Sequence, residues 1–293
     1  IINYKCSFTC MVSKYILLFK MTRPVNILIA ILTLLTGYCL MGYYPPILQL
    51  LIECISFSAA IAFGNIHNDV IDVKIDAINQ PDRPLQSGLI SLPMANSFAG
   101  ICFGIPVILS IAPLNSTLHA TFFALLLLIL FAYNRWLKNA FLLKNITVAF
   151  LCTTPLILNI LNNKEQAILI YPLILFAFFF MFSRELIKDI EDEPGDFQQG
   201  MLTFPILVGV KKASFFAILN LIFSLHTLIL PVAAGIYTPW FLIFSAIPVT
   251  LLTIQAILKI KKKLFKASQK FIKLAILAGI VGLILSQRVL IFY

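Results

Sequence analysis

Two groups of aspartates share one spacing in a chain that is otherwise strongly hydrophobic. Both read D-x-x-D-x-x-x-D; the first aspartate motif comprises Asp69, Asp72 and Asp76, and the second aspartate motif comprises Asp189, Asp192 and Asp196. Carboxylates crowded this closely repel one another and raise each other's pKa unless a cation lies among them. A merely solvated charge run gives no reason for an identical spacing to return 120 residues later. The repeat therefore predicts a cation site.

The first motif forms one polar stripe if the segment is helical. At about 100° per residue its three aspartates fall within an arc of roughly 60°. Asn65 lies inside this arc and Asn68 at its edge. Apolar residues precede the stripe, which predicts that it lies at the end of a hydrophobic helix.

The second motif follows another apolar segment. Glu185, Asp189 and Asp192 share a similar arc on a helix. Pro194 lacks a backbone N–H, so we expect it to break or kink the helix before Asp196. Two carboxylate stripes that face each other across the mouth of a helix bundle would form an oxygen-only site.

Oxygen-only ligands favour a hard cation. Mg²⁺ typically uses few protein carboxylates together with the phosphates of a substrate. An EF-hand is excluded, because the aspartates follow helical periodicity and no glycine lies between them. Zinc is disfavoured because His67 has no second His or Cys at ligand spacing, and we expect it to be a simple hydrogen-bonding residue.

Basic residues next to the acids could bind a phosphate group. Arg83 follows the first motif, and Arg184 and Lys188 enter the second, so we expect these three to bind a diphosphate. For Arg23 and Lys138 a role in membrane topology alone is an equal alternative. A diphosphate that leaves as an anion needs both a metal ion and cationic donors.

Membrane-spanning helices must position these residues. The chain has 293 residues, 60% of them hydrophobic, and a mean hydropathy of +0.98. A spanning helix needs about 20 apolar residues, and the runs do not alternate as strands would. We predict an all-α, polytopic bundle of nine transmembrane helices at roughly 24–43, 47–64, 95–113, 117–134, 141–161, 166–184, 212–234, 238–258 and 271–290.

The basic residues orient this bundle. All but Lys164 and Arg288 of the 22 basic residues fall on one side of the expected helices, which the positive-inside rule assigns to the cytoplasm. Ten of the twelve acids lie in two loops on that same side. We expect a cytoplasmic-side site, a cytoplasmic N-terminus, an external C-terminus and a place in the cell membrane. Residues 1–20 form the expected N-terminal segment and 21–293 the transmembrane domain, with no cleaved signal peptide.

Charge and cysteine content exclude other partners. The net charge of +10 is mostly the positive-inside signature plus attraction to anionic membrane lipids. We expect no nucleic-acid partner, because no soluble domain presents a basic patch. The six cysteines form no C-x-x-C pair, and we assign them neither a metal nor a disulfide.

These residues resemble the UbiA family of intramembrane prenyltransferases, from about residue 15 to the C-terminus. The family's first motif, N-D-x-x-D-x-x-x-D, matches Asn68 and the first aspartate motif, and its second, D-x-x-D-x-x-x-D, matches the second. Supporting matches are TRPVN at 22–26, DRPLQSG at 82–88, YNRWLK at 133–138, KNITVAF at 144–150 and GMLTFP at 200–205. One departure is Lys144, where relatives usually have glycine before the residue matching Asn145.

The resemblance implies nine transmembrane helices and Mg²⁺-dependent transfer of a polyprenyl group from its diphosphate, with the isoprenoid tail in the apolar bundle. The metal ligands it implies are Asn68, Asp69, Asp72, Asp76, Asp189, Asp192 and Asp196, with Asp72, Asp76, Asp189 and Asp192 as catalytic residues. The diphosphate-binding residues expected with them are Asn65, Asn68, Arg83, Lys138, Arg184 and Lys188.

The acceptor has two main alternatives. TRPVN and INQPDRPLQSG look most like the digeranylgeranylglyceryl phosphate synthase branch, whose members form an ether lipid from geranylgeranylglyceryl phosphate and a geranylgeranyl donor. The other alternative is the branch that prenylates an aromatic acid, 4-hydroxybenzoate or dihydroxynaphthoate, in quinone biosynthesis. A cation-coupled transporter is a rival of another class, but it would place ionisable residues near the membrane midplane rather than at helix ends.

Overall fold

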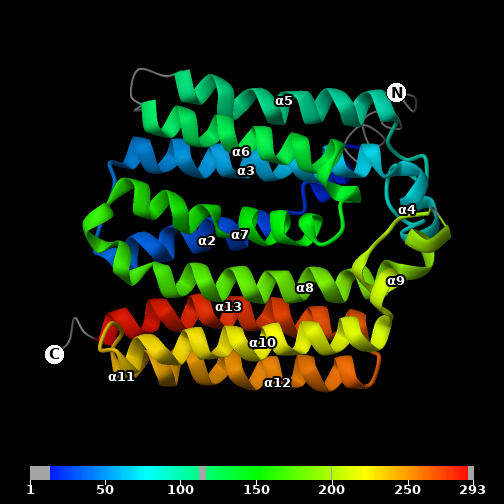
Figure 1. The fold of residues 1–293 in the computed structure, drawn as a ribbon. Coiled ribbons are helices and arrows are strands. Elements are labelled where there is room, and N and C mark those ends of the chain that lie inside the picture. The colour runs from blue at the N-terminus through cyan, green and yellow to red at the C-terminus, as the bar shows by residue number, and fades with distance from the viewer. Residues whose placement is uncertain (1–13, 112–116, 199, 290–293) are drawn as a thin grey trace, which may run out of the picture. The chain divides into compact units, whose positions relative to one another are not determined.

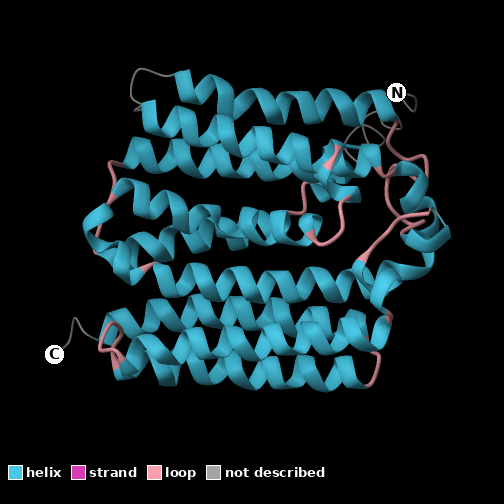
Figure 2. Cartoon of the chain, in the orientation of Figure 1, coloured by secondary structure: helices cyan, strands magenta, loops and turns pink. Residues whose placement is uncertain are grey.

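The computed structural model describes residues 14–111, 117–198 and 200–289 of the chain. Every regular element in these ranges is a helix (Figure 2), which confirms the all-α prediction. The chain divides into two compact units: unit 1 comprises Ile1–Ile31 and Pro45–Lys138, and unit 2 comprises Leu32–Tyr44 and Asn139–Tyr293. The expected N-terminal segment 1–20 lies largely outside the described residues.

Helices long and apolar enough to cross a membrane dominate the fold. Within the described ranges eight meet this condition: α2 (Pro24–Met41), α3 (Ile47–Ile71), α5 (Leu92–Ile111), α6 (Thr117–Arg135), α7 (Leu143–Asn162), α10 (Val210–Ala233), the run Pro239–Lys261 and Phe265–Ser286 of α13. Helices suit the bilayer because they satisfy every backbone polar group internally. The chain is an integral membrane protein of many spans.

The sixth expected segment, 166–184, lies mostly in α8 (Tyr171–Gln198). This helix is longer than expected, and its first turns are apolar. From its middle onward it carries Arg184, Glu185 and Lys188, so α8 is not among the eight helices apolar enough to count as spans. The count of nine transmembrane helices therefore stays a prediction.

Unit 1 is built on α3, which packs against α5 and α6 (Figure 1). Phe57 of α3 meets Phe123 of α6 edge to face, and both are nearly fully buried. Farther toward the start of α3, the fully buried Glu53 lies 2.9 Å from His119 of α6, Oε1 to Nε2. Ile101 and Ile108 point outward from α5, as lipid-facing side chains do.

Short elements complete unit 1 at the end of α3. They are α4 (Val73–Asn79) and the start of the 3₁₀ turn η1 (Leu137–Asn139), with turns through residues 80–91 between α4 and α5. These segments carry the acidic and basic side chains that the apolar helices exclude.

Unit 2 is a helical bundle in which α8 packs against α7, α10 and α13. Its core contains the fully buried Phe180, Leu186 and Leu221. Asn159 of α7 donates a hydrogen bond from Nδ2 to the carbonyl of Leu34 in α2 at 3.1 Å. The remaining short elements are η2 (Lys164–Leu169), α9 (Phe204–Val208) and α11 (Pro239–Phe241).

A π-helical segment, η3 (Leu242–Ala246), joins α11 to α12 (Ile247–Lys261) and packs against α13 (Phe265–Val289). Gly282 of α13 lies so close that a Cβ there would be 2.0 Å from the Phe244 carbonyl oxygen. The Ser245 hydroxyl donates to the Gly279 carbonyl at 3.1 Å. Small residues on α13 therefore permit the close approach of the π-helical backbone.

The expected break at Pro194 is wrong. Helix α8 continues through Pro194 to Gln198, and Asp196 is a buried residue of that helix. Proline removes one i to i−4 hydrogen bond, but Pro194 comes near the end of α8 and its own side chain is exposed. The local cost is therefore small enough for the last turn to persist.

Candidate functional site

The first aspartate motif spans the joint between two helices. Asp69 is in the last turns of α3, Asp72 is the residue between α3 and α4, and Asp76 is in α4. Backbone bonds continue across the joint, from Asp72 N to the Asn68 carbonyl at 2.9 Å and from Asp76 N to the Asp72 carbonyl at 2.8 Å. The near-helical course keeps the three carboxylates on one side.

Cationic side chains neutralise all three aspartates of the first motif. Arg83 places Nη1 at 3.0 Å from Asp69 Oδ1 and forms an ion pair with Asp76 as well. Lys138, which follows α6, pairs with Asp72. The contact of one guanidinium with both Asp69 and Asp76 confirms that these two residues share a face. Arg83 and Lys138 thus lie against the carboxylates of the first motif.

Arg23 joins the same cluster from the residue before α2. Its Nη2 lies 2.7 Å from Asp69 Oδ1, and its Nη1 donates to Asn65 Oδ1 at 3.1 Å. Asn65 in turn donates to the Thr22 carbonyl at 3.0 Å. Arg23 has a φ of +56°, which is unfavourable for a residue with a side chain. These contacts hold the backbone in that conformation.

The second aspartate motif lies on α8 in unit 2. Asp189 is buried, with a side chain that is 6% exposed, and both of its carboxylate oxygens have donors. Lys144 Nζ lies 2.8 Å from Oδ1, and Asn145 Nδ2 donates to Oδ2 at 2.8 Å. Both donors come from the first turn of α7, which therefore supplies the partner groups of this motif.

The other acidic residues of α8 have fewer contacts. Glu185 pairs with its neighbour Arg184, and Gln269 of α13 donates to Glu191 Oε2 at 2.8 Å. In the described part of unit 2 no hydrogen bond or ion pair involves the carboxylates of Asp192 and Asp196. These two carboxylates remain available to a cation.

Burial changes the acidity of three of these groups. It raises the pKa of Asp76 to about 6, although the Arg83 guanidinium opposes the shift. It raises the pKa of Asp196 to about 6, against the charge of Lys144. It also raises the pKa of Asp189, where Lys144 and Asn145 favour the charged form. In each case the loss of water outweighs the neighbouring cation.

The donor set has the chemistry that Mg²⁺ requires. Every acidic group of the two motifs is an oxygen ligand, and the first motif gathers cations around three aspartates whose side chains are at most 12% exposed. No three His, Cys, Asp or Glu side chains in the described ranges already converge on one point. The carboxylates of the first motif instead contact ammonium and guanidinium groups.

Most of the expected residues of the first motif gather and Arg23 joins them, whereas Lys144 and Asn145 contact the second motif. Asn65, Asp69, Asp72, Asp76, Arg83 and Lys138 form one cluster in unit 1. In the described residues the Asn68 side chain makes no hydrogen bond, and Lys188 forms no ion pair. Sequence reasoning left Arg23 undecided and assigned no role to Lys144 or Asn145. The position of Arg23 directly before Pro24, the first residue of α2, was the sequence feature that could have indicated its place in the cluster.

His67 is a packed residue. Its ring stacks on Phe63 and Phe131, with centroids 5.1 Å and 5.5 Å away, and its Nδ1 lies 3.1 Å from Asn134 Nδ2. Asn134 also donates to the Gly64 carbonyl. These contacts agree with the expectation of a simple hydrogen-bonding histidine.

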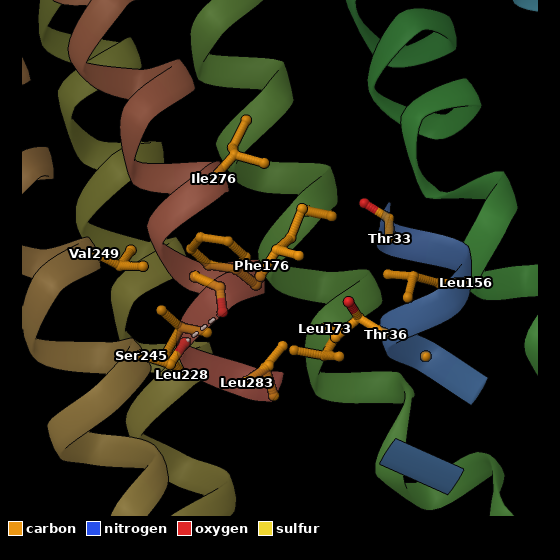
Figure 3. A pocket seen from close by; sticks show the side chains of 14 residues that line it. Thr33, Thr36, Leu156, Leu173, Phe176, Leu228, Ser245, Val249, Ile276 and Leu283 are labelled. Carbon is orange, nitrogen blue, oxygen red and sulfur yellow. Dashed lines mark hydrogen bonds between the residues drawn. The ribbon is translucent and has the colours of Figure 1, made fainter. Parts of the chain in front are cut away.

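Unit 2 also encloses an apolar cavity of about 70 Å³ (Figure 3). Its wall includes Phe176 of α8, Leu228 of α10 and Leu283 of α13. Polar atoms are few: Ser245 is bonded to a backbone carbonyl, and the Thr36 hydroxyl is buried without a hydrogen-bond partner in the described chain. A lining of this kind suits a hydrocarbon chain.

Comparison with known proteins identifies the family. The model of the UbiA prenyltransferase family matches residues 30–278. A digeranylgeranylglyceryl phosphate synthase of Methanoculleus marisnigri is 37% identical over 203 residues, 68% of this chain and 70% of the relative. The enzyme of the same name from Thermococcus sibiricus is 34% identical over 274 residues, 92% of this chain and 96% of the relative.

Solved structures share the fold. A structure of digeranylgeranylglyceryl phosphate synthase is 26% identical with a TM-score of 0.71, covering 94% of this chain and 99% of that one. A UbiA homologue from Archaeoglobus fulgidus, bound to DMAPP and Mg²⁺, is 15% identical with a TM-score of 0.57, covering 91% and 98%. The chain is an enzyme and belongs to the UbiA prenyltransferase family.

Proposed function

We propose that this protein transfers a geranylgeranyl group from its diphosphate to geranylgeranylglyceryl phosphate, forming an ether lipid. The observation that carries the proposal is the cluster of three buried aspartates with Arg83 and Lys138, in a chain whose relatives at 37% and 34% identity are digeranylgeranylglyceryl phosphate synthases. In the reaction the bond between the donor carbon and the diphosphate oxygen breaks. The glycerol hydroxyl oxygen bonds to that carbon and loses its proton.

The aspartates of each motif are proposed to hold Mg²⁺ in their own unit. Bound Mg²⁺ would neutralise charge on the leaving diphosphate, as the A. fulgidus homologue holds Mg²⁺ with DMAPP. Asp69, Asp72 and Asp76 would hold Mg²⁺ in unit 1, and Asp192 and Asp196 would hold Mg²⁺ in unit 2. Arg83 and Lys138 already lie beside the carboxylates, so they would donate to the diphosphate oxygens once a metal ion takes their place.

The apolar cavity of unit 2 is proposed to take part of an isoprenoid tail. Its wall is mostly apolar, with hydroxyl groups only from Thr33, Thr36 and Ser245 among the residues that line it, so burial of a hydrocarbon there is favourable. We further propose that α8 completes nine spans, with the motifs and the N-terminus on the cytoplasmic side and the C-terminus outside. The asymmetric placement of the basic residues supports this orientation.

The test uses purified protein, labelled geranylgeranyl diphosphate and a panel of acceptors. We expect a labelled ether lipid with geranylgeranylglyceryl phosphate, and no product with 4-hydroxybenzoate or dihydroxynaphthoate. Chelation of Mg²⁺ with EDTA should stop the release of diphosphate. Asp72→Ala and Asp192→Ala should each abolish activity, whereas Asp82→Ala, at an exposed aspartate beside Arg83, should retain it. Labelling of an aromatic acid alone would refute the proposed acceptor.

A further inference from the structure

Asp189 differs from the aspartates of the first motif in how its oxygens are used. In the described chain each first-motif carboxylate has one oxygen without a partner: Oδ2 of Asp69 and Asp72, and Oδ1 of Asp76. Asp189 has none, since Lys144 binds Oδ1 and Asn145 donates to Oδ2. Both oxygens of Asp189 therefore already contact a fixed donor, and one of these donors is a cation.

The position of Lys144 costs free energy that this contact must offset. Lys144 is the second residue of α7, and a cation near a helix N-terminus opposes the helix dipole. Its side chain is only 15% exposed, so the ammonium has lost much of its water. A buried lysine at such a place is stable only beside a fixed negative charge, and Asp189 at 2.8 Å supplies it.

The same ammonium acts on the rest of the motif. Its positive charge also influences Asp196 and Glu185, so one fixed cation serves three carboxylates of α8. A divalent ion on Asp189 would lie within a few ångströms of this ammonium, and the two cations would repel each other. Asp192 and Asp196 lack such a bound partner in the described residues.

We propose that the Lys144 ammonium is a built-in cation of the second aspartate motif, which takes the place of a metal ion on Asp189. The divalent ion of this motif is then held by Asp192 and Asp196, and Asp189 positions Lys144. The inference rests on the proposed function, because it assigns the metal ligands of that site.

The test measures Mn²⁺ binding by the electron paramagnetic resonance signal of free Mn²⁺, with protein and metal alone. Asp189→Asn should weaken Mn²⁺ binding far less than Asp192→Asn does, because only Asp192 is proposed to bind the ion directly. Lys144→Met should tighten Mn²⁺ binding by about tenfold, the scale of effects of groups around a metal site. The double variant Lys144→Met/Asp189→Asn should lose this increase in Mn²⁺ affinity. Lys144→Arg, which keeps the positive charge, should bind Mn²⁺ as tightly as the unchanged protein does.

Controls keep the test decisive. Lys164→Met removes an exposed lysine and should change nothing. If Lys144→Met does not fold, Asp189→Asn alone still tests whether Asp189 binds the metal ion. Asparagine is close to isosteric with aspartate and keeps an acceptor for Lys144. Equal weakening by Asp189→Asn and Asp192→Asn would overturn the inference. No donor or acceptor is present, so a wrong acceptor in the proposed function leaves this result unaffected.

Discussion

The ion pair between Lys138 and Asp72 predicts a measurable loss of stability when the lysine loses its charge. The two side chains are 11% and 12% exposed, so the pair is nearly buried. Removing one partner of a buried pair costs about 3–5 kcal/mol, because a charge is left without compensation. For Lys138→Met we expect the low end, about 3 kcal/mol, since methionine keeps most of the aliphatic packing and Asp72 retains some contact with water.

The loss should be visible in thermal unfolding of the protein in detergent with EDTA. A change of about 3 kcal/mol lowers the Tm by roughly 6–12 °C at this chain length. Lys74→Met, at an exposed lysine of α4, is the matched control and should leave the Tm unchanged. Added Mg²⁺ should restore Lys138→Met more than it stabilises the unchanged protein, because the metal ion supplies the missing positive charge at Asp72.

A double variant separates charge from packing. Lys138→Met/Asp72→Asn removes both charges and should recover most of the lost stability, as neutral replacements of buried pairs do. If the double variant is as unstable as Lys138→Met, the loss comes from packing and the reasoning from the ion pair is wrong. The same conclusion follows if Lys138→Met is as stable as Lys74→Met.

Two further predictions concern positions outside the aspartate motifs. Gly282→Ala should lower the Tm, because its Cβ would lie 2.0 Å from a backbone carbonyl oxygen, whereas Gly104→Ala, with open space around it, should not. His119→Ala should lower the free energy of unfolding by about 2 kcal/mol, because the fully buried Glu53 loses a partner at 2.9 Å. The exposed His226 bonds the carbonyl of its own helix, so His226→Ala is the control. If Gly104→Ala lowers the Tm as much as Gly282→Ala does, the steric argument is wrong. If His226→Ala lowers it as much as His119→Ala does, the argument from the buried pair is wrong.

The periodicity of the sequence predicted the features that depend on residues close together in the chain, namely the helices and the polar stripe of the first motif. The apolar runs indicated the helices because length and hydrophobicity alone decide which segments can span a bilayer. The polar stripe of the first motif was predicted for the same reason, since residues three or four apart share a helix face. Pro194 was misjudged because the cost of a proline depends on its distance from the helix end.

Periodicity could not predict the ion pairs between residues that are far apart in the sequence. Lys138 and Asp72 are 66 residues apart, and Lys144 and Asp189 are 45 apart. Nothing in the spacing says which lysine meets which carboxylate. Arg23 illustrates the same point, because its pairing with Asp69 requires the turn before α2 to adopt a positive φ. Spacing identified the groups that carry charge, and packing selected the pairs.

The π-helical segment has a consequence for how this chain aligns with its relatives. A π turn closes its hydrogen bonds over five residues rather than four, so it contains one residue more than the α-helix it interrupts. The wider turn absorbs that extra residue, so a one-residue deletion within Leu242–Ala246 would return the segment to an α-helix and leave the flanking helix faces in nearly the same register. Val249, which follows the segment, would then still face the cavity that it lines now. A homologue without this segment should therefore align with a one-residue gap here and keep the same cavity-facing positions after it.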